Sequence, residues 1–334
     1  MTQPVMVRAG NYSLTWRKAF GNYRKGVYQP YLIPCSIPSE YQHLSVAAVS
    51  LVENECDHAK NALTVFYNKP RGEKQNFAVC VKNLDFLLED VSSVLTEWIE
   101  MMTLLGADKI FLYYLNVHPN ISKVFKYYED LGRVEAKSVM NRVQDEVISL
   151  NDCLYKHMHE YKYLVVVDID EVIVPLNGST WNDLMDHLER TLDKEYDSYN
   201  ARNVYYFTDL LFTHKWFDDV PEYMHILNHI HRAPTILKAG INIKSFHNTK
   251  TVLSLHNHFP VACLRGGCKN FPINPDDALM HHYKRKPIKR YTNFRETSII
   301  DTTIWKYKKV LVKKVTKALK DMGFLVPLKK PLRV

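Results

Sequence analysis

The segment that decides the fold is Tyr163-Leu164-Val165-Val166-Val167-Asp168-Ile169-Asp170-Glu171. The run from Leu164 to Val167 is apolar on both faces, which predicts a central strand. Three carboxylates follow it at once, and ligands in open α/β sheets bind beyond the carboxyl ends of the strands. Because an extended chain points Asp168 and Asp170 to the same side, this strand end predicts a site for a hard divalent cation.

Outward from this segment, strands alternate with helices. We predict strands over 77–81, 109–115 and 133–139, and helices over 95–105, 119–131, 146–160 and 180–192. Gly106 is a natural helix stop, Pro119 opens a helix, and Thr180 with Asp183 resembles a capping box. This alternation predicts a parallel sheet with helices on both faces. After about residue 196 strands and loops follow, and a basic helix is predicted over 304–322.

The composition is that of a globular protein of 334 residues, with 46% hydrophobic and 24% charged residues. The net charge of +8 is uneven, because residues 284–334 contain 16 Lys and Arg against 3 Asp and Glu. Such a tail suits a diphosphate, an anionic membrane surface or a nucleic acid, or is a solvated face. We find no signal peptide and no apolar run of about 18 residues, so the protein is soluble or lacks an anchor that a longer form carries.

Two chemistries fit the carboxylate cluster. In one, a metal ion grips a nucleotide diphosphate and assists its departure. In the other, Asp168 is a nucleophile and Asp170 a general acid, as in haloacid-dehalogenase phosphatases, with Asp276-Asp277 as a later metal-binding pair. The phosphatase motif normally lies on the first strand, whereas here a strand–helix–strand unit over 77–139 precedes it. A nucleotide-binding half followed by D-x-D is the order of an A-type (GT-A) glycosyltransferase.

With these pieces assembled, the chain resembles glycosyltransferase family 92 over about residues 30–295. The matching segments, in family order, are Phe77–Lys82, Glu97–Glu100, Leu104–Gly106, Tyr127–Gly132, Asn151–Leu154, Tyr163–Pro175 and His282–Lys284. The family usually ends on His-Tyr-Arg, and here Lys284 replaces that arginine. The resemblance implies an α/β fold of GT-A type, with a Rossmann-like nucleotide-binding half and a mixed central sheet. It also implies an inverting, manganese-dependent transfer of a hexose, galactose above all, from a UDP-sugar to a glycan hydroxyl.

The resemblance assigns metal binding to Asp168, Asp170 and His282, and the rival ligands are His256 and His258. Neutral imidazole suits Mn²⁺. Lys284 and Arg285, which follow the last motif, would hold the diphosphate oxygens. The nucleoside would lie between the strand end at Val81 and Lys82 and the helix start at Asn151 and Asp152.

An inverting transfer needs a base for the acceptor hydroxyl. We expect Glu171 first and Asp277 second, with Asp276 beside it. The alternative to a transferase, besides the phosphatase, is a non-catalytic glycan-binding protein.

Family members are commonly anchored in the Golgi by one N-terminal span, which is not visible here. The resemblance therefore implies a Golgi lumenal or membrane setting, membrane association through a missing anchor, and a glycan acceptor such as an N-glycan. We expect no nucleic-acid partner. In that setting Cys35–Cys56 and Cys263–Cys268 are the predicted disulfides, and six free thiols are the alternative. We expect an N-terminal region over 1–75, a catalytic domain over 76–300, and a basic helix and tail over 301–334.

Overall fold

The structure is a computed structural model that describes residues 33, 35–54, 57–68, 72–139, 146–208, 217–284 and 294–325. The chain divides into two compact units, Met1–Arg71 and Gly72–Val334. In the first unit, β1 (Ala48–Val49) and β2 (Leu63–Thr64) pair antiparallel, and both strands are exposed. The apolar side chains around β1, such as Leu44, Leu51 and Val52, are exposed and not covered by a core, so the strand is limited to two residues.

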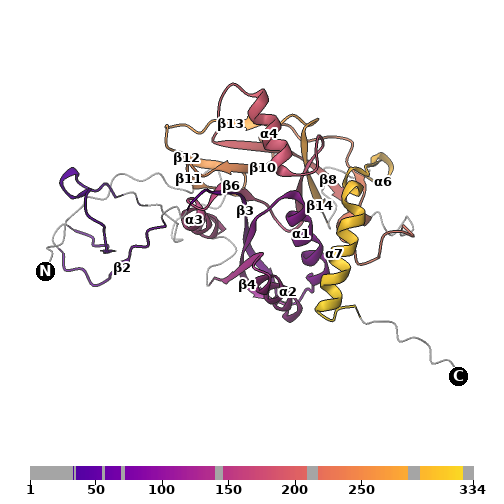
Figure 1. Cartoon of the computed structure of the whole chain (residues 1–334), viewed down its shortest axis with the longest axis horizontal. Helices are drawn as coiled ribbons and strands as arrows, with labels where there is room; N and C mark the ends of the chain where they lie inside the picture. The colour runs from indigo at the N-terminus through magenta and orange to yellow at the C-terminus, as the bar shows by residue number, and fades with distance from the viewer. Residues whose placement is uncertain are drawn as a thin grey trace. The chain divides into compact units, whose positions relative to one another are not determined.

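The second unit is built on one mixed sheet, shown in Figure 1, which has eleven strands within the described residues. They are β3 (Gln75–Phe86), β4 (Lys109–Val117), β5 (Val134–Ser138), β6 (Tyr161–Val166), β7 (Glu171–Pro175), β8 (Ser198–Phe207), β9 (His231–Arg232), β10 (Lys244–Asn248), β13 (Asn270–Pro272), β14 (Ala278–Lys284) and β15 (Ile299–Ile300). A separate hairpin joins β11 (Val252–Leu255) to β12 (Pro260–Cys263).

The strand order places the parallel half of the sheet first in the chain. β5, β4, β3 and β6 are parallel neighbours in that order, which is the 3-2-1-4 arrangement of a mononucleotide-binding unit. The sheet then continues with β10, which is antiparallel to both β6 and β8. A parallel half followed by an antiparallel strand confirms the predicted mixed α/β fold of GT-A type.

Two strands bring the end of the chain back to the carboxylates. β14 runs antiparallel to β7 and parallel to β8, with His282 opposite Glu171 on one side and Tyr205 on the other. β7 begins directly after the turn that ends β6. Residues more than 100 positions apart in the sequence therefore meet at one sheet edge.

Helices cover both faces of the sheet, as predicted. They are α1 (Ser92–Leu105), α2 (Pro119–Asp130), α3 (Glu146–His157), α4 (Trp181–Thr191), α5 (His225–Asn228), α6 (Phe294–Thr297) and α7 (Lys308–Asp321). Figure 1 shows α1, α2 and α7 on one side of β3 and β4, and α3 on the other. The local signals are confirmed: Gly106 ends α1 with a φ of 106°, Pro119 begins α2, and Thr180 with Asp183 forms a capping box.

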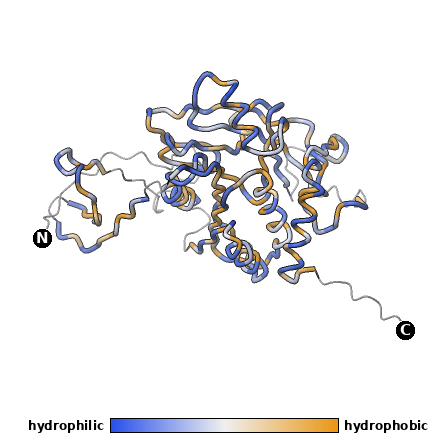
Figure 2. The backbone as a smooth tube through the Cα atoms, viewed as in Figure 1, coloured by the Kyte–Doolittle hydropathy of each residue, from blue (hydrophilic) through white to orange (hydrophobic). Residues whose placement is uncertain are grey.

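The core consists of two main layers, one on each face of the sheet. The larger contains Phe77, Trp98 and Trp181, and the smaller contains Cys80, Cys153 and Leu164. In Figure 2 hydrophobic residues run along the central strands. Burying each large apolar side chain contributes roughly 1.5–3 kcal/mol, so these layers supply most of the stabilisation of the sheet.

The disulfides differ in part from the prediction. Cys263–Cys268 is formed as predicted, but the predicted Cys35–Cys56 bond is wrong, because Cys35 is a free, exposed cysteine. Cys56 lies outside the described residues. A second disulfide joins Cys80 on β3 to Cys153 on α3 across 73 residues of sequence. Both of its cysteines are fully buried, so it links the sheet to α3 inside the core.

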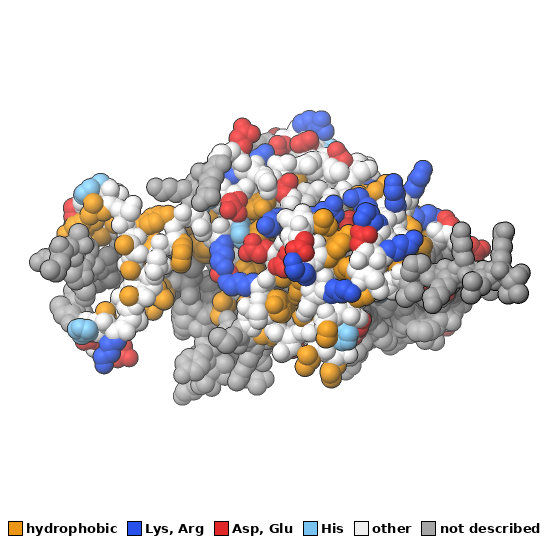
Figure 3. All heavy atoms as spheres, turned by 60° about the horizontal axis from the view of Figure 1, so that its bottom comes forward, with side chains coloured by type: hydrophobic (Ala, Val, Ile, Leu, Met, Phe, Trp, Pro, Cys, Tyr) orange, Lys and Arg blue, Asp and Glu red, His pale blue; other side chains and the backbone are white. Residues whose placement is uncertain are grey.

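The basic helix α7 packs against α1 through Leu311, Val315 and Leu319. The boundary expected at residue 301 stays a prediction. On the face shown in Figure 3, basic side chains are interspersed with acidic ones, and Lys317 of α7 pairs with Asp321. Within the described residues, no helix combines the length and the apolar character needed to cross a bilayer.

Candidate active site

The turn after β6 is held by backbone hydrogen bonds. The amide N–H of Glu171 donates to the carbonyl of Asp168 at 2.9 Å, and the N–H of Asp168 donates to Glu171 Oε2 at 2.9 Å. From outside the turn, the indole of Trp98 donates to the Glu171 carbonyl at 2.9 Å, and the N–H of Tyr283 donates to the Asp170 carbonyl at 2.8 Å. The core thus fixes the direction in which each carboxylate points.

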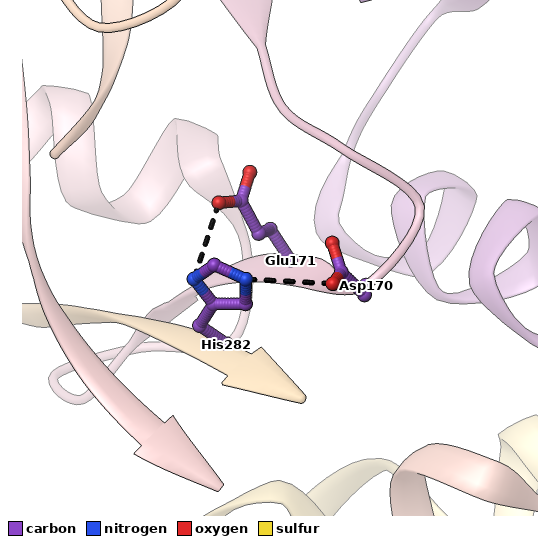
Figure 4. Close-up of side chains that lie close together, drawn as sticks. All are labelled: Asp170, Glu171 and His282. Carbon is purple, nitrogen blue, oxygen red and sulfur yellow. Dashed lines mark ion pairs between the residues drawn. The ribbon is translucent and has the colours of Figure 1, made fainter. Parts of the chain in front are cut away.

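His282 lies between two of these carboxylates (Figure 4). Its Nε2 is 3.4 Å from Asp170 Oδ2, and its Nδ1 is 3.3 Å from Glu171 Oε1. Nδ1 also lies 3.2 Å from the side-chain amide of Asn203. In the tautomer with the proton on Nδ1, which the Glu171 carboxylate stabilises, the lone pair of Nε2 is free for a ligand. Nε2 is buried and has no hydrogen-bond partner among the described residues.

This arrangement fits a divalent metal ion. One ligand atom each from Asp170, Glu171 and His282 lies within 4.8 Å of the others. Carboxylate oxygen and imidazole nitrogen are ligands that Mn²⁺ accepts. A second carboxylate that orients a ligating imidazole is a common feature of such sites. Asp168, expected as a ligand, is not in this group.

Asp168 instead faces two lysines. Its Oδ2 is 3.2 Å from Nζ of Lys244 and 3.5 Å from Nζ of Lys82, and Lys244 also lies 3.1 Å from Glu171 Oε2. Burial raises the pKa of Asp168, but the attraction of Lys244 and Lys82 outweighs it and leaves the pKa well below its usual range. For Glu171 burial dominates and raises the pKa, although Lys244 opposes the shift.

The two rival histidines lie on the Lys244 side of the cluster and have other contacts. The Nδ1 of His258 is 2.9 Å from the carbonyl of Ile243, and His256 stacks on Phe259. The metal-ligating group described above includes neither of them.

Among the residues expected at the nucleotide, the structure brings Lys82 and Lys284 to the cluster. Lys284 Nζ is 3.7 Å from Asp170 Oδ2, and Lys82 also pairs with Glu146 at 3.1 Å. Arg285 lies outside the described residues. Both lysines are partly exposed and border the same cavity, so they are available to an anionic ligand.

The other residues expected at the nucleotide have structural contacts. Val81 is fully buried. Asn151 exchanges two hydrogen bonds with the backbone of Leu255, at 3.0 and 2.9 Å, which fastens α3 to β11. Asp152 accepts hydrogen bonds from Tyr113, Lys137 and Lys156. None of these three lines the cavity beside the cluster.

The two base candidates are also separated. Glu171 is 2% exposed, and its carboxylate contacts Lys244, His282 and the N–H of Asp168. Asp277 precedes β14, five positions before His282, which corresponds to about 17 Å along an extended strand. There it lies 3.3 Å from His187 and accepts a hydrogen bond from Asn177. The geometry favours a positioning role for Glu171 and leaves Asp277 away from the cluster.

A cavity of about 560 Å³ opens beside the carboxylates. Its charged and polar lining includes Lys82, Asp168, Asp170, His225 and Lys284, and its apolar lining includes Leu84, Phe86, Val91 and Val94. This size and mixed lining suit a small-molecule ligand with an anionic part and a flat apolar part.

The wall formed by α5 was not predicted from the sequence. Burial and the neighbouring His229 lower the pKa of His225 to about 3, so its imidazole is neutral. Glu97, which is fully buried on α1, accepts hydrogen bonds from the N–H groups of His225, Ile226 and Leu227. This carboxylate holds the start of α5 against α1.

The fold and the cluster at its strand ends are those of a GT-A glycosyltransferase. Glycosyltransferase family 92 matches residues 75–315, and the chain belongs to this family. The family assignment decides against the phosphatase alternative. No curated protein matches the chain. The apo structure of the bifunctional glycosyltransferase WbbM is similar at 13% identity and a TM-score of 0.27, over 57% of this chain and 34% of that chain. This chain thus spans about a third of the length of that protein.

Proposed function

We propose that this glycosyltransferase moves a hexose from a UDP-sugar to a glycan hydroxyl with inversion, using a divalent ion at Asp170 and His282. The observation that carries the proposal is His282 Nε2. This buried nitrogen has no hydrogen-bond partner among the described residues, and it faces Asp170 at 3.4 Å beside a cavity bordered by cations. Galactose is favoured by the family resemblance alone. Mn²⁺ is favoured by the resemblance and by the carboxylate and imidazole ligands that Asp170 and His282 offer.

Each residue of the cluster has a distinct part in this proposal. Asp170 and His282 would hold the ion, and Glu171 would keep the imidazole in the tautomer that leaves Nε2 free. Lys82 and Lys284 would receive the diphosphate oxygens as point charges. A bound Mn²⁺ would supply Lewis-acid stabilisation of the leaving diphosphate.

Inversion also requires a proton acceptor near the acceptor hydroxyl. The cavity lining contains Asp85, Glu89 and His225 in addition to the cluster. These side chains, unlike Asp277, border the space in which a donor sugar would lie. We propose that the base is one of them, in place of Glu171.

We also propose that the chain works in the Golgi lumen, as the family resemblance implies. The fully buried Cys80–Cys153 disulfide supports an oxidising compartment, because structural disulfides persist in such compartments. Membrane attachment would then depend on a segment other than the described helices.

The test is a thermal-shift titration of the full chain with UDP, with and without Mn²⁺, followed by UDP-galactose and UDP-glucose as donors. We expect stabilisation by UDP only with the ion, by about 2.7 kcal/mol at a hundredfold excess over Kd. UDP-galactose should then release UDP faster than UDP-glucose when a glycan acceptor is added. UDP binding that is indifferent to Mn²⁺ and to EDTA would contradict the proposal.

A further inference from the structure

Lys244 is an unusual component of the site. It begins β10, its side chain is fully buried, and it lies 3.1 Å from Glu171 Oε2 and 3.2 Å from Asp168 Oδ2. Its ammonium also donates to Asn257 Oδ1. Three acceptors thus surround the three donors of one ammonium group in the interior.

The ammonium is charged in this position. Two of its three acceptors are carboxylate oxygens, at 3.1 and 3.2 Å, which is the environment that an ammonium ion requires in the interior. A buried charge persists only with such partners, because an isolated one would lose its proton. Lys244 is therefore a permanent cation within the acidic cluster.

Two further cations lie at the cluster. Lys82 is 3.5 Å from Asp168 and 3.1 Å from Glu146, and Lys284 is 3.7 Å from Asp170. Three ammonium groups thus face four carboxylates before any ion binds, so all but one of the negative charges is already offset. Only Lys244 is fully buried; Lys82 and Lys284 are 30% and 39% exposed and can turn toward a ligand.

This balance changes how a divalent ion is held. The two positive charges of a divalent ion exceed the single negative charge that the three ammonium groups leave unbalanced, and Lys244 cannot leave. A nucleoside diphosphate brings negative charge to the same place. The electrostatic penalty on the ion therefore falls when the diphosphate is present.

We propose that Lys244 is a built-in counter-ion of the acidic cluster, which makes retention of Mn²⁺ depend on the nucleoside diphosphate. This rests on the proposed function, because it takes Mn²⁺ and UDP as ligands of the site. Linkage requires the reverse as well: Mn²⁺ must increase the affinity for UDP by the same factor. Lys244 is a positioning and charge-setting residue in this proposal and touches no substrate.

The experiment measures Mn²⁺ binding by electron paramagnetic resonance of the free ion, with and without saturating UDP. In the wild-type protein we expect UDP to tighten Mn²⁺ binding by about tenfold or more, within the usual range of coupling between sites. In Lys244→Met we expect Mn²⁺ alone to bind about tenfold more tightly, and the effect of UDP to shrink accordingly.

The matched control is Lys250→Met. This lysine follows β10 closely, is 65% exposed and pairs with the exposed Glu195 at 3.7 Å, so its loss should change neither Mn²⁺ affinity nor the coupling. Should Lys244→Met fail to fold, Lys82→Met removes a partly exposed cation from the same Asp168 oxygen, and we expect a smaller tightening of about threefold.

Unchanged or weaker Mn²⁺ binding in folded Lys244→Met, or in Lys82→Met if it replaces that variant, overturns the proposal. This failure is distinct from that of the proposed function. If the function is wrong, the wild-type protein itself shows no Mn²⁺-dependent UDP binding. If only the role of Lys244 is wrong, wild-type coupling is present and the lysine variants leave it intact.

Discussion

The two ends of β14 each have a histidine beside an aspartate at nearly the same distance. At the carboxyl end His282 is 3.4 Å from Asp170, and next to the amino end His187 is 3.3 Å from Asp277. Their exposures are reversed: His282 is 9% and Asp170 36% exposed, whereas His187 is 37% and Asp277 17% exposed. At the first end the imidazole is fixed and the carboxylate faces a cavity; at the second the carboxylate is tied to Asn177. The surroundings of a pair, and not its distance, therefore distinguish a site from a surface contact.

The largest effect expected from this difference is on transfer activity. Asp170→Asn removes a charge that would hold the ion, so we expect the rate to fall by about 10²–10³-fold, as when other electrostatic stabilisers are removed. Asp277→Asn is the matched change at the other end and should keep the rate within about threefold, as an exposed pair contributes little. UDP release with donor and acceptor measures both. Equal losses of transfer rate in the two variants would contradict the difference between the two pairs and would restore Asp277 as the candidate base.

The sequence alone was sufficient to predict the carboxylates near the carboxyl end of β14. A hydrophobic strand that runs into Asp168 and Asp170 is one contiguous signal, and the strand–helix alternation around it predicted the parallel half of the sheet. His282 was found through a quoted family segment. These features depend on residues near one another in the chain or in a recognisable order.

The sequence was insufficient where a residue acts through tertiary contact alone. Lys244 is one of many lysines, and only the antiparallel pairing of β10 with β6 places it on Asp168. The same holds for Cys80–Cys153, since closeness in sequence favoured a Cys35–Cys56 pair that is not formed. Asn151 and Asp152 offered suitable hydrogen-bonding groups, but the packing of α3 uses them for structure.

Glu97 extends the comparison, because it is as buried as Glu171 but is held by three backbone N–H groups, whereas Glu171 lies beside Lys244. Burial raises the pKa of Glu97 to about 7, although three backbone N–H groups oppose the shift. The folded protein then binds this proton more tightly than the unfolded chain, so the contribution of Glu97 to stability is fully present below about pH 4.5 and is lost as the pH rises to about 7. The loss is about 3 kcal/mol.

Urea unfolding at pH 4.5, 6 and 8 measures this effect in the wild type and in Glu97→Gln. The difference in unfolding free energy between the two proteins should shift by about 3 kcal/mol over this range, in favour of the wild type at the acid end. The control is Glu129→Gln, which changes an exposed acid on α2 and should give a constant difference. Parallel curves for Glu97→Gln would show that the backbone donors keep its pKa near an ordinary value.

The smallest expected effect concerns Glu171, which lies beside His282 at the carboxyl end of β14. If Glu171 orients His282, Glu171→Gln should weaken Mn²⁺ binding by about 10–100-fold, the usual range for a carboxylate behind a ligating imidazole. The rate should then recover at high Mn²⁺. A lost base would instead lower the maximal rate by about 10²–10⁴-fold at every Mn²⁺ concentration, with the affinity for the ion unchanged. Asn177→Ala is the matched control, because it removes the hydrogen bond to Asp277 at the other end of β14. It should alter neither the Mn²⁺ affinity nor the maximal rate, since neither Asn177 nor Asp277 lines the cavity.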